Sequence, residues 1–188
     1  MSLIIRSSAI HAAGCYTTAP IPKRTRIVEY TGPHISKERA DEKYQDSPTT
    51  YLFGLGNGET VIDGFGLAMF INHSCDPNCE TKEVKGHVWI FSLRNIADGE
   101  ELTYDYNLYD GDEDEALCNC GAANCRKSMY SPEELVRRAR AAKRAAAKKA
   151  AKKEKTAKKH PGKKTPGKKH PEERRTTKSR KTSPSTRG

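Results

Sequence analysis

Charged and apolar residues are distributed unevenly along the 188-residue chain, and this division decides which part can fold. Residues 131–188 contain 22 Lys and Arg against 5 Asp and Glu, a net charge of +17, whereas residues 1–130 contain 12 against 19. Almost all aromatic and branched apolar residues lie in the first 130 residues. Only this part can bury enough apolar surface to offset the entropy that a chain loses on folding. We therefore expect one compact domain followed by a basic extension.

Short strands dominate the expected structure of the compact domain. Apolar and β-branched runs, separated by turn residues, occupy residues 3–5, 26–30, 51–55, 60–63 and 87–93. The sequence Gly56-Asn57-Gly58 between two of these runs predicts a tight hairpin, because glycine and asparagine tolerate positive φ. One short helix is expected from an N-cap at Ser36 to Tyr44. The predicted fold class is therefore mainly β.

A second helix is expected over residues 131–155. Ser131-Pro132-Glu133-Glu134 offers an N-cap, a proline at the first helical position and a carboxylate in the capping-box position. The Ala, Lys and Arg residues that follow favour a helix but form no apolar stripe, so we expect fraying from like-charge repulsion. Residues 156–188 combine lysine pairs with Pro and Gly, a composition typical of a disordered tail.

Membrane and disulfide classes are disfavoured. No apolar stretch approaches the length of a membrane span, and no signal-peptide core is present at the start, so we expect a soluble protein that does not contact membranes. The chain has six cysteines, but Cys118, Cys120 and Cys125 are too closely spaced for a disulfide framework. Metal binding is the better interpretation of these three residues.

Three clusters within the first 130 residues contain side chains that are suited to catalysis or metal binding. Residues 70–79 read FINHSCDPNC and combine an amide, an imidazole, a hydroxyl and two thiols. Residues 99–107 read GEELTYDYN and place Tyr104 and Tyr106 at strand spacing, so both rings project to one face. Residues 118–126 read CNCGAANCR and contain the three closely spaced cysteines.

These clusters, in this order, resemble the SET domain of protein lysine methyltransferases followed by its cysteine-rich post-SET segment. The resemblance is strongest to the trithorax/mixed-lineage-leukaemia type and extends over nearly all of residues 4–130, including SAIHAAG at 8–14 and VEYTG at 28–32. Each motif alone is weak, but their order makes coincidence improbable. The resemblance implies a SET fold of short curved sheets with a pseudo-knot over residues 1–109, and a post-SET zinc-binding segment over residues 110–130. It also implies transfer of a methyl group from S-adenosylmethionine to a protein lysine.

The resemblance further assigns roles to individual residues. The residues implied in binding the methyl donor are Gly14, Cys15, Tyr16, Asn72, His73 and Tyr106. Tyr106 matches the catalytic position, and Tyr51 and Tyr30 are expected in the wall of the lysine channel. Tyr104 matches the position at which tyrosine limits the product, because its hydroxyl can hold a water that a further methyl group would displace. We expect mainly monomethylation, with some dimethylation.

The zinc ligands implied by the resemblance are Cys75, Cys118, Cys120 and Cys125, a closed set of four thiolates suited to a structural ion. Cys79 is the rival of Cys75 as fourth ligand, and Cys15 is expected to be a small buried apolar residue or to lie near the donor. Ala12 replaces the first glycine of the family's donor loop, which adds a methyl group where close backbone approach is expected.

The partners follow from charge and from the resemblance. Residues 131–188 are expected to bind nucleic acid without sequence preference, although a tail that only solvates the protein is the plainer interpretation. The expected substrate is a basic protein, histone or histone-like, with the chain's own tail as a further candidate, and the expected location is chromatin or nucleoid. Two alternatives remain: an architectural DNA-binding protein with a catalytically weak SET module, and a methyltransferase of a non-histone target such as a ribosomal protein.

Overall fold

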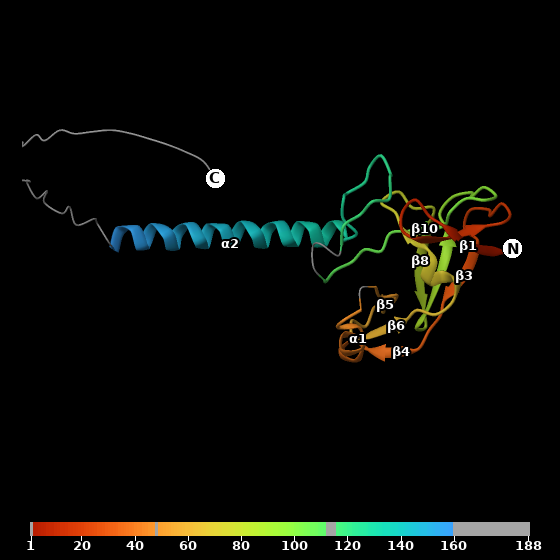
Figure 1. The fold of residues 1–188 in the computed structure, drawn as a ribbon, viewed down its shortest axis with the longest axis horizontal. Helices are drawn as coiled ribbons and strands as arrows, with labels where there is room; N and C mark the ends of the chain where they lie inside the picture. Colours follow the sequence, from red (N-terminus) through yellow and green to blue (C-terminus); the bar gives the residue numbers. More distant parts are fainter. Residues whose placement is uncertain (1, 48, 112–115, 160–188) are drawn as a thin grey trace, which may run out of the picture. The chain divides into compact units, whose positions relative to one another are not determined.

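The computed structural model describes residues 2–47, 49–111 and 116–159. The chain divides into two compact units, residues 1–142 and residues 143–188. All the strands belong to the first unit, together with the first turns of the long helix α2 (Figure 1). The elements in chain order are β1 (Leu3–Ser7), β2 (Ala13–Thr17), β3 (Arg26–Tyr30), β4 (His34–Ser36), α1 (Lys37–Tyr44), β5 (Leu52–Gly54), β6 (Thr60–Asp63), the 3-10 helix η1 (Leu67–Phe70), β7 (Asn72–His73), β8 (Cys79–Val84), β9 (His87–Ser92), β10 (Thr103–Tyr104) and α2 (Pro132–Lys159).

The strands form three small sheets, which confirms the mainly β fold class. β1 pairs with β2, β6 lies between β4 and β5, and the largest sheet has the order β3-β9-β8-β10-β7. The hairpin predicted at Gly56-Asn57-Gly58 joins β5 to β6, and Gly58 has a φ of 74°. Because each sheet is short, the residues of the site come from the ends of several strands and the loops between them.

The largest sheet is interlocked. β10 lies between β7 and β8, although β7 and β8 are neighbours in the chain, and it runs parallel to both. The side chain of Asn78, buried in the connection between β7 and β8, fixes this insertion from the side. Its Oδ1 accepts from the Thr103 backbone N–H at 2.9 Å, and its Nδ2 donates to the Glu101 carbonyl at 2.7 Å. This arrangement brings Tyr104 beside His73.

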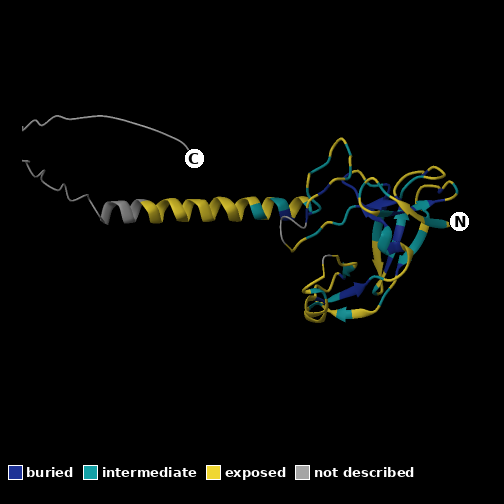
Figure 2. Cartoon of the chain, viewed as in Figure 1, coloured by how far each residue is buried: buried dark blue, intermediate teal, exposed yellow. Residues whose placement is uncertain are grey.

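The apolar core of the first unit is made by residues from almost every strand. Ile62, Val88, Ile90 and Leu102 are each at most 1% exposed, and they pack in one cluster with Ile71, which follows η1. In Figure 2 the buried residues gather among the strands, whereas α2 is exposed along most of its length. The alternation of buried and less buried residues along β9 agrees with a strand that covers the core with one face.

Both expected helices are present. Ser36 caps α1, and its hydroxyl accepts from the Arg39 backbone N–H. Ser131 caps α2 by accepting from the Glu134 backbone N–H at 3.1 Å. The Glu134 carboxylate pairs with Arg137 and Arg138 and not with the backbone of Ser131, so the reciprocal half of the capping box is not formed.

α2 extends to Lys159, past the expected end at residue 155, and from residue 143 it belongs to the second unit. Its residues from Ala139 to Lys153 are exposed. Most of the segment expected to be disordered, residues 160–188, lies outside the described residues. None of the helices in the described ranges is both long and apolar enough to cross a bilayer.

Candidate active site and metal centre

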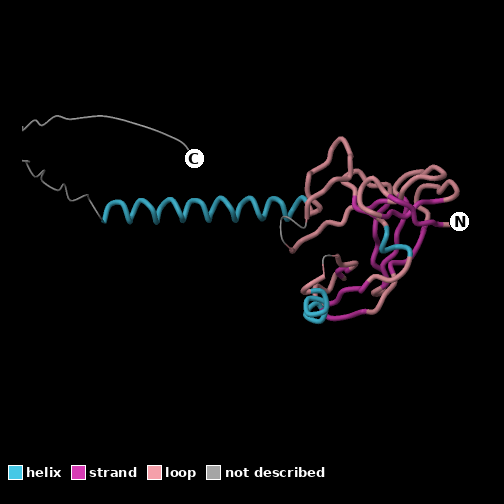
Figure 3. The backbone as a smooth tube through the Cα atoms, viewed as in Figure 1, coloured by secondary structure: helices cyan, strands magenta, loops and turns pink. Residues whose placement is uncertain are grey.

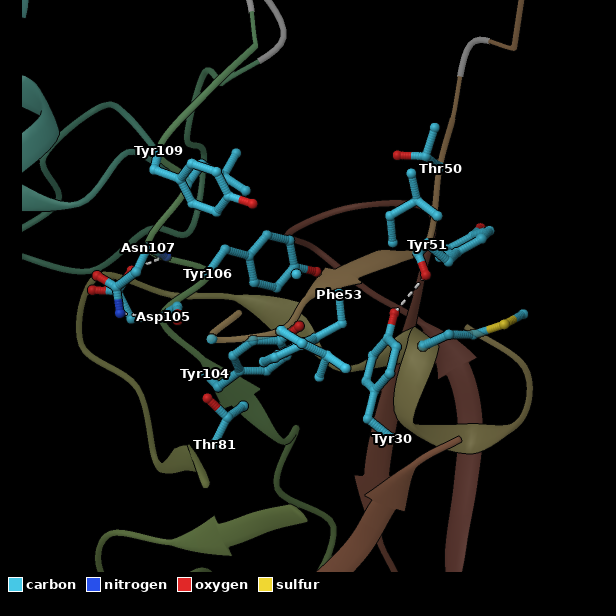
Figure 4. Close-up of a pocket in the computed structure, with 16 residues that line it drawn as sticks. Tyr30, Thr50, Tyr51, Phe53, Thr81, Tyr104, Asp105, Tyr106, Asn107 and Tyr109 are labelled. Carbon is cyan, nitrogen blue, oxygen red and sulfur yellow. Dashed lines mark hydrogen bonds between the residues drawn. The ribbon is translucent and has the colours of Figure 1, made fainter. Parts of the chain in front are cut away.

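An aromatic cavity of about 360 Å³ lies between the β5 segment and the chain that follows β10. Tyr104 and Tyr106 form one side of it, and their ring centroids are 4.9 Å apart, as the strand spacing predicted. Tyr30 and Phe53 form another part of the lining, with centroids 5.3 Å apart. Figure 4 shows the Tyr106 ring between Tyr109 and Tyr104. The structure therefore brings four of the predicted tyrosines, those at 30, 51, 104 and 106, into one cavity.

Tyr106 is held at both ends. Its hydroxyl donates to the Ile71 carbonyl at 3.0 Å, and its backbone N–H donates to His73 Nδ1 at 3.1 Å. Burial raises the pKa of Tyr106 well above its usual range, so the phenol keeps its proton near neutral pH. Because that proton points to Ile71, the lone pairs of the hydroxyl oxygen remain available to a group in the cavity.

His73 is buried and neutral. Burial lowers its pKa to about 4, against the opposing influence of the Asp105 carboxylate. Since Nδ1 accepts from Tyr106, the single proton of the ring lies on Nε2, which is 3.4 Å from Cys75 Sγ. His73 therefore joins the tyrosine cavity to the cysteine cluster.

The other three tyrosines shape the cavity through burial and backbone contacts. The Tyr30 hydroxyl donates to the Tyr51 carbonyl at 2.9 Å, which fixes the start of the β5 segment (Figure 4). Tyr51 is 39% exposed and lies at the rim, whereas Tyr104 is 7% exposed. Burial raises the pKa of Tyr104 far above its usual range, so it too stays protonated. The cavity thus narrows from an open rim to a buried phenol.

Asn72, Ser8 and Tyr16 converge on one carboxylate, that of Glu101. Asn72 Nδ2 donates to Glu101 Oε1 at 2.8 Å and to the Ala13 carbonyl at 2.9 Å. The Ser8 hydroxyl donates to Glu101 at 2.8 Å, and the Tyr16 hydroxyl donates to it at 3.0 Å. This network ties β2 to the strand residues that precede Tyr106.

Glu101 also explains the glycine at position 14. A Cβ on Gly14 would lie 2.2 Å from Glu101 Oε1, so any side chain there would displace the carboxylate. Gly14 was predicted as a donor-binding residue, and the structure shows a reason for a glycine that lies within the protein. Ala12 has a φ of 21°, at the edge of the conformations that favour glycine, which agrees with its place in a loop where the family carries one.

Four cysteines meet where the resemblance implied. The Sγ atoms of Cys75, Cys118, Cys120 and Cys125 all lie within 4.8 Å of one another. Cys118 Sγ is 3.8 Å from Cys75 Sγ and 3.7 Å from Cys125 Sγ. A tetrahedral zinc ion with Zn–S bonds of ~2.3 Å requires sulfur atoms about 3.8 Å apart, so the four thiols fit such an ion closely.

Backbone N–H groups already face these sulfur atoms. Arg126 N–H donates to Cys75 Sγ at 3.3 Å, and Cys75 N–H donates to Cys120 Sγ at 3.4 Å. Cys120 N–H donates to Cys118 Sγ and Lys127 N–H to Cys125 Sγ, both at 3.4 Å. Donors directed at sulfur stabilise thiolates, the form that binds metal. With four protein ligands and no open position, the site is suited to a structural ion.

The two remaining cysteines lie in the apolar core. Cys79 is 1% exposed on β8, and burial raises the pKa of its thiol to about 12. Cys15 is completely buried on β2, and burial raises the pKa of its thiol to about 11. Cys75 lies in the cluster of four sulfur atoms and Cys79 does not, so the choice of fourth ligand falls to Cys75.

The profile of the SET domain matches residues 12–107, about half of the chain, a range that contains the tyrosine cavity and the Asn72-His73 strand. The chain belongs to the SET-domain family. The SET match includes Cys75 and ends at residue 107, so the other three cysteines of the cluster, Cys118, Cys120 and Cys125, lie beyond it. The cluster has the form of a post-SET zinc site appended to the SET domain.

Several curated proteins resemble this SET domain at about 40% identity. An Eremothecium gossypii protein named histone-lysine N-methyltransferase, H3 lysine-4 specific, is 42% identical over 133 residues, 63% of this chain and 14% of the relative. Drosophila melanogaster histone-lysine N-methyltransferase trr is 40% identical over 140 residues, and human histone-lysine N-methyltransferase 2D is 38% identical over the same length; these cover 68% of this chain and 6% and 2% of the relatives. The chain thus spans no more than about a seventh of these relatives.

Glu101, Asp105 and Arg126 were not predicted as site residues from the sequence. Glu101 joins Ser8 and Asn72, and Arg126 binds Asp105 with two hydrogen bonds of 2.8 Å. All three lie inside the clusters that carried the resemblance, which was the available signal. Their partners are 21 to 93 residues away in the chain, so spacing alone does not reveal them.

Proposed function

We propose that this chain is a protein lysine N-methyltransferase that uses S-adenosylmethionine and acts on a basic protein, histone or histone-like. The tyrosine cavity carries the proposal: Tyr106 and Tyr104 line a narrow aromatic space directly beside His73 in a SET domain. The names of the relatives support the histone class of substrate, and with it a location at chromatin. A catalytically weak architectural module and a ribosomal substrate remain the competing possibilities.

The residues proposed for the donor site form one chain of contacts. Asn72 holds the Ala13 carbonyl next to Gly14, His73 follows Asn72, and the His73 and Tyr106 rings are 5.3 Å apart. Backbone carbonyls of β2, an amide and aromatic faces suit a ligand that combines an amino-acid group with a sulfonium cation. When bound, S-adenosylmethionine supplies the electrophilic methyl group. Gly14, Cys15 and Tyr16 are proposed to present their backbone to it.

The proposed contribution of the protein is alignment and charge stabilisation. A lysine amine confined by Tyr104, Tyr106 and Tyr51 would have little freedom to rotate away from a productive geometry, an effect that can supply several kcal/mol. The lone pairs of Tyr106 face positive charge near the amine, because its proton is donated to Ile71. Zinc at the four cysteines would order the segment after residue 107 without entering the chemistry.

No base for the lysine is available in the lining. Among the described residues that line the cavity, the one carboxylate is Asp105, and both of its oxygens bind Arg126. The lysine must therefore lose its proton to solvent before reaction, and only the neutral amine attacks. We expect the rate at subsaturating substrate to rise with pH from neutrality toward the lysine pKa of about 10.4. A plateau near pH 7 would indicate a protein base and contradict this part of the proposal.

The product is proposed to be mainly monomethyl-lysine, with some dimethyl-lysine. Tyr104 is 7% exposed and its ring centroid lies 4.9 Å from that of Tyr106, so there is little room beside the amine. Tyr104→Phe removes only the hydroxyl and is expected to increase higher methylation. Mass spectrometry of the product distribution at equal turnover distinguishes the two enzymes.

The decisive experiment is methyl transfer from tritiated S-adenosylmethionine to mixed histones, ribosomal proteins and the protein's own tail, followed by mass spectrometry of the labelled lysines. We expect labelling of histone lysines and a loss of roughly 100-fold or more in Tyr106→Phe, since misplacement of the reacting groups costs about that much. Tyr44→Phe, which changes a tyrosine outside the cavity lining, serves as the matched control. Donor binding measured by calorimetry separates a weak module from an inactive preparation.

We further propose that α2 binds nucleic acid without sequence preference. Exposed basic residues recur along this helix, among them Arg140, Lys143, Arg144, Lys148 and Lys149. Helical periodicity places Arg140, Lys143, Arg144 and Lys148 on one face of the helix, a row of positive charge that suits contacts with the phosphate backbone.

The test is fluorescence anisotropy with a short DNA duplex over a series of salt concentrations. Replacing Lys143, Arg144, Lys148 and Lys149 by Gln should weaken binding and reduce the slope of log K against log salt by roughly 0.9 for each phosphate that the helix no longer neutralises. Lys82→Gln on β8 is the control. An unchanged slope in the fourfold variant would leave the helix as a solvating extension.

A further inference from the structure

An ion pair between Asp105 and Arg126 joins the two halves of the proposed site. Asp105 lies between Tyr104 and Tyr106, and Arg126 directly follows Cys125. The two terminal nitrogens of Arg126 donate to the two carboxylate oxygens of Asp105, each at 2.8 Å. The side chains are only 20% and 21% exposed. This two-point geometry in a partly buried position is the strongest form of side-chain ion pair.

Contacts extend the pair in both directions. Asp105 directly precedes Tyr106, whose backbone N–H donates to His73 Nδ1 at 3.1 Å. On the other side, the Arg126 backbone N–H donates to Cys75 Sγ at 3.3 Å. Arg126 Nη2 also donates to the Tyr130 carbonyl at 3.3 Å. A continuous path therefore runs from the thiol cluster through Arg126 to Tyr106.

The ion pair adds a side-chain link to a backbone link between the same segments. Between β10 and α2 the chain is loop in its described residues (Figure 3), and Leu108 pairs with Tyr130 in a single bridge, with backbone hydrogen bonds of 3.0 and 2.9 Å. Arg126 Nε is buried without a hydrogen-bond partner in the described part of the chain, which is a cost that the three bonds of the terminal nitrogens must outweigh. By contrast, the Lys82–Glu80 pair on β8 is about half exposed, and such pairs contribute little.

We propose that Arg126 is a positioning residue: its bond to Asp105 straps the metal-binding segment to the chain that carries Tyr106, so that the cysteine cluster and the catalytic tyrosine are ordered together. The expected effect on kcat rests on the proposed function. The expected effect on zinc retention requires only that the four thiols bind zinc. Arg126 acts through Asp105 and is not among the residues that line the lysine cavity.

The test compares Arg126→Gln, Asp105→Asn and the double variant, each as the full chain loaded with zinc. Two quantities are measured: the rate of zinc release to the indicator 4-(2-pyridylazo)resorcinol, and kcat and KM for methyl transfer. Residues that orient metal ligands typically change metal affinity or activity by about 10- to 100-fold. We expect each single variant to accelerate zinc release and lower kcat on this scale, and the double variant to be no worse than either.

Arg94→Gln is the matched control. It removes an arginine from the Arg94–Glu100 ion pair, and neither residue is a sequence neighbour of the four cysteines. It should leave zinc release at the wild-type rate. Arg126→Lys keeps the positive charge but cannot make the two parallel hydrogen bonds, so its zinc-release rate and kcat should lie between those of wild type and Arg126→Gln. If Arg126→Gln does not fold, Arg126→Lys takes its place in the comparison.

Wild-type zinc release in Arg126→Gln or Arg126→Lys, or additive effects in the double variant, would overturn the strap. Absence of methyl transfer in the wild-type protein would overturn the proposed function instead. The zinc-release comparison does not depend on turnover, so the two failures are distinguishable.

Discussion

The first 142 residues and the exposed part of α2 are held in shape by different kinds of contact. In the first unit the decisive contacts are long-range: β10 between β7 and β8, four cysteines spread over 50 residues, and one core cluster. From residue 143 to residue 153 the helix is exposed, and its alanine, lysine and arginine residues favour it through helix propensity. In the first unit a single substitution should therefore affect the stability of the whole unit, whereas in the exposed part of α2 it should affect only the helix around it.

The largest effect is expected where a long-range contact is also a metal ligand. Cys118→Ser should lower zinc content, abolish methyl transfer and lower thermal stability, because structural zinc contributes on the order of 10 kcal/mol in small domains. Metal analysis and a thermal melt followed by the fluorescence of Trp89 measure these changes. Cys79→Ala, which changes a buried thiol outside the cluster, should keep one zinc ion per chain. Full zinc content in Cys118→Ser would remove that residue from the ligand set.

A core substitution should come next. Ile90→Ala on β9 empties a fully buried site and is expected to lower the free energy of unfolding by about 2–5 kcal/mol. Val84→Ala, at a residue that is 52% exposed on the adjacent β8, should cost much less. Chemical denaturation of the two variants gives both values. Equal decreases in the free energy of unfolding would mean that burial around Ile90 contributes no more to the stability of the unit than an exposed side chain does.

A glycine in the exposed helix should have a smaller and local effect. Ala146→Gly is expected to cost about 1 kcal/mol of helix stability and to lower the helical signal in circular dichroism. The unfolding midpoint of the first unit, followed by Trp89 fluorescence, should not move. A shift of that midpoint would show that the helix is coupled to the domain, and would break the contrast between the two regions.

The smallest effect is that of salt on the same helix. Arg140, Arg144 and Lys148 succeed one another at four-residue spacing, and like charges at this spacing cost about 0.2–0.5 kcal/mol per pair. Raising sodium chloride from 0.01 to ~1 M shortens the screening length to about 3 Å and should increase helicity slightly. Lys148→Gln should reduce this salt response. A fall in helicity with salt would mean that attractive pairs dominate.

The sequence predicted the elements that depend on local signals. Strands β3 and β6, the hairpin at Gly56-Asn57-Gly58 and the caps at Ser36 and Ser131 all follow from runs and turn chemistry that lie close together in the chain. Strand β8 was missed because CETKEV has few apolar residues, and its pairing with β9 and β10 supplies what its composition lacks. β7 and β10 are two residues each, too short for any periodicity.

The candidate site was predicted to a different extent. The tyrosine pair followed from strand spacing, whereas the four-cysteine set came only from the resemblance and is now supported by sulfur distances of 3.7 and 3.8 Å. The network around Glu101 could not be foreseen, because it joins residues 8, 16 and 72 to residue 101. The assigned catalytic and donor-binding roles stay predictions until the variants above are measured.

The insertion of β10 between β7 and β8 has a consequence for biosynthesis. Residues 103–104 are synthesised after β7 and β8, so these two strands cannot complete their sheet until β10 has been made. Until then, Asn78 Oδ1 lacks the Thr103 backbone N–H from which it accepts a hydrogen bond in the folded protein. Chains that terminate before residue 103 therefore lack both the tyrosine pair and the closed sheet.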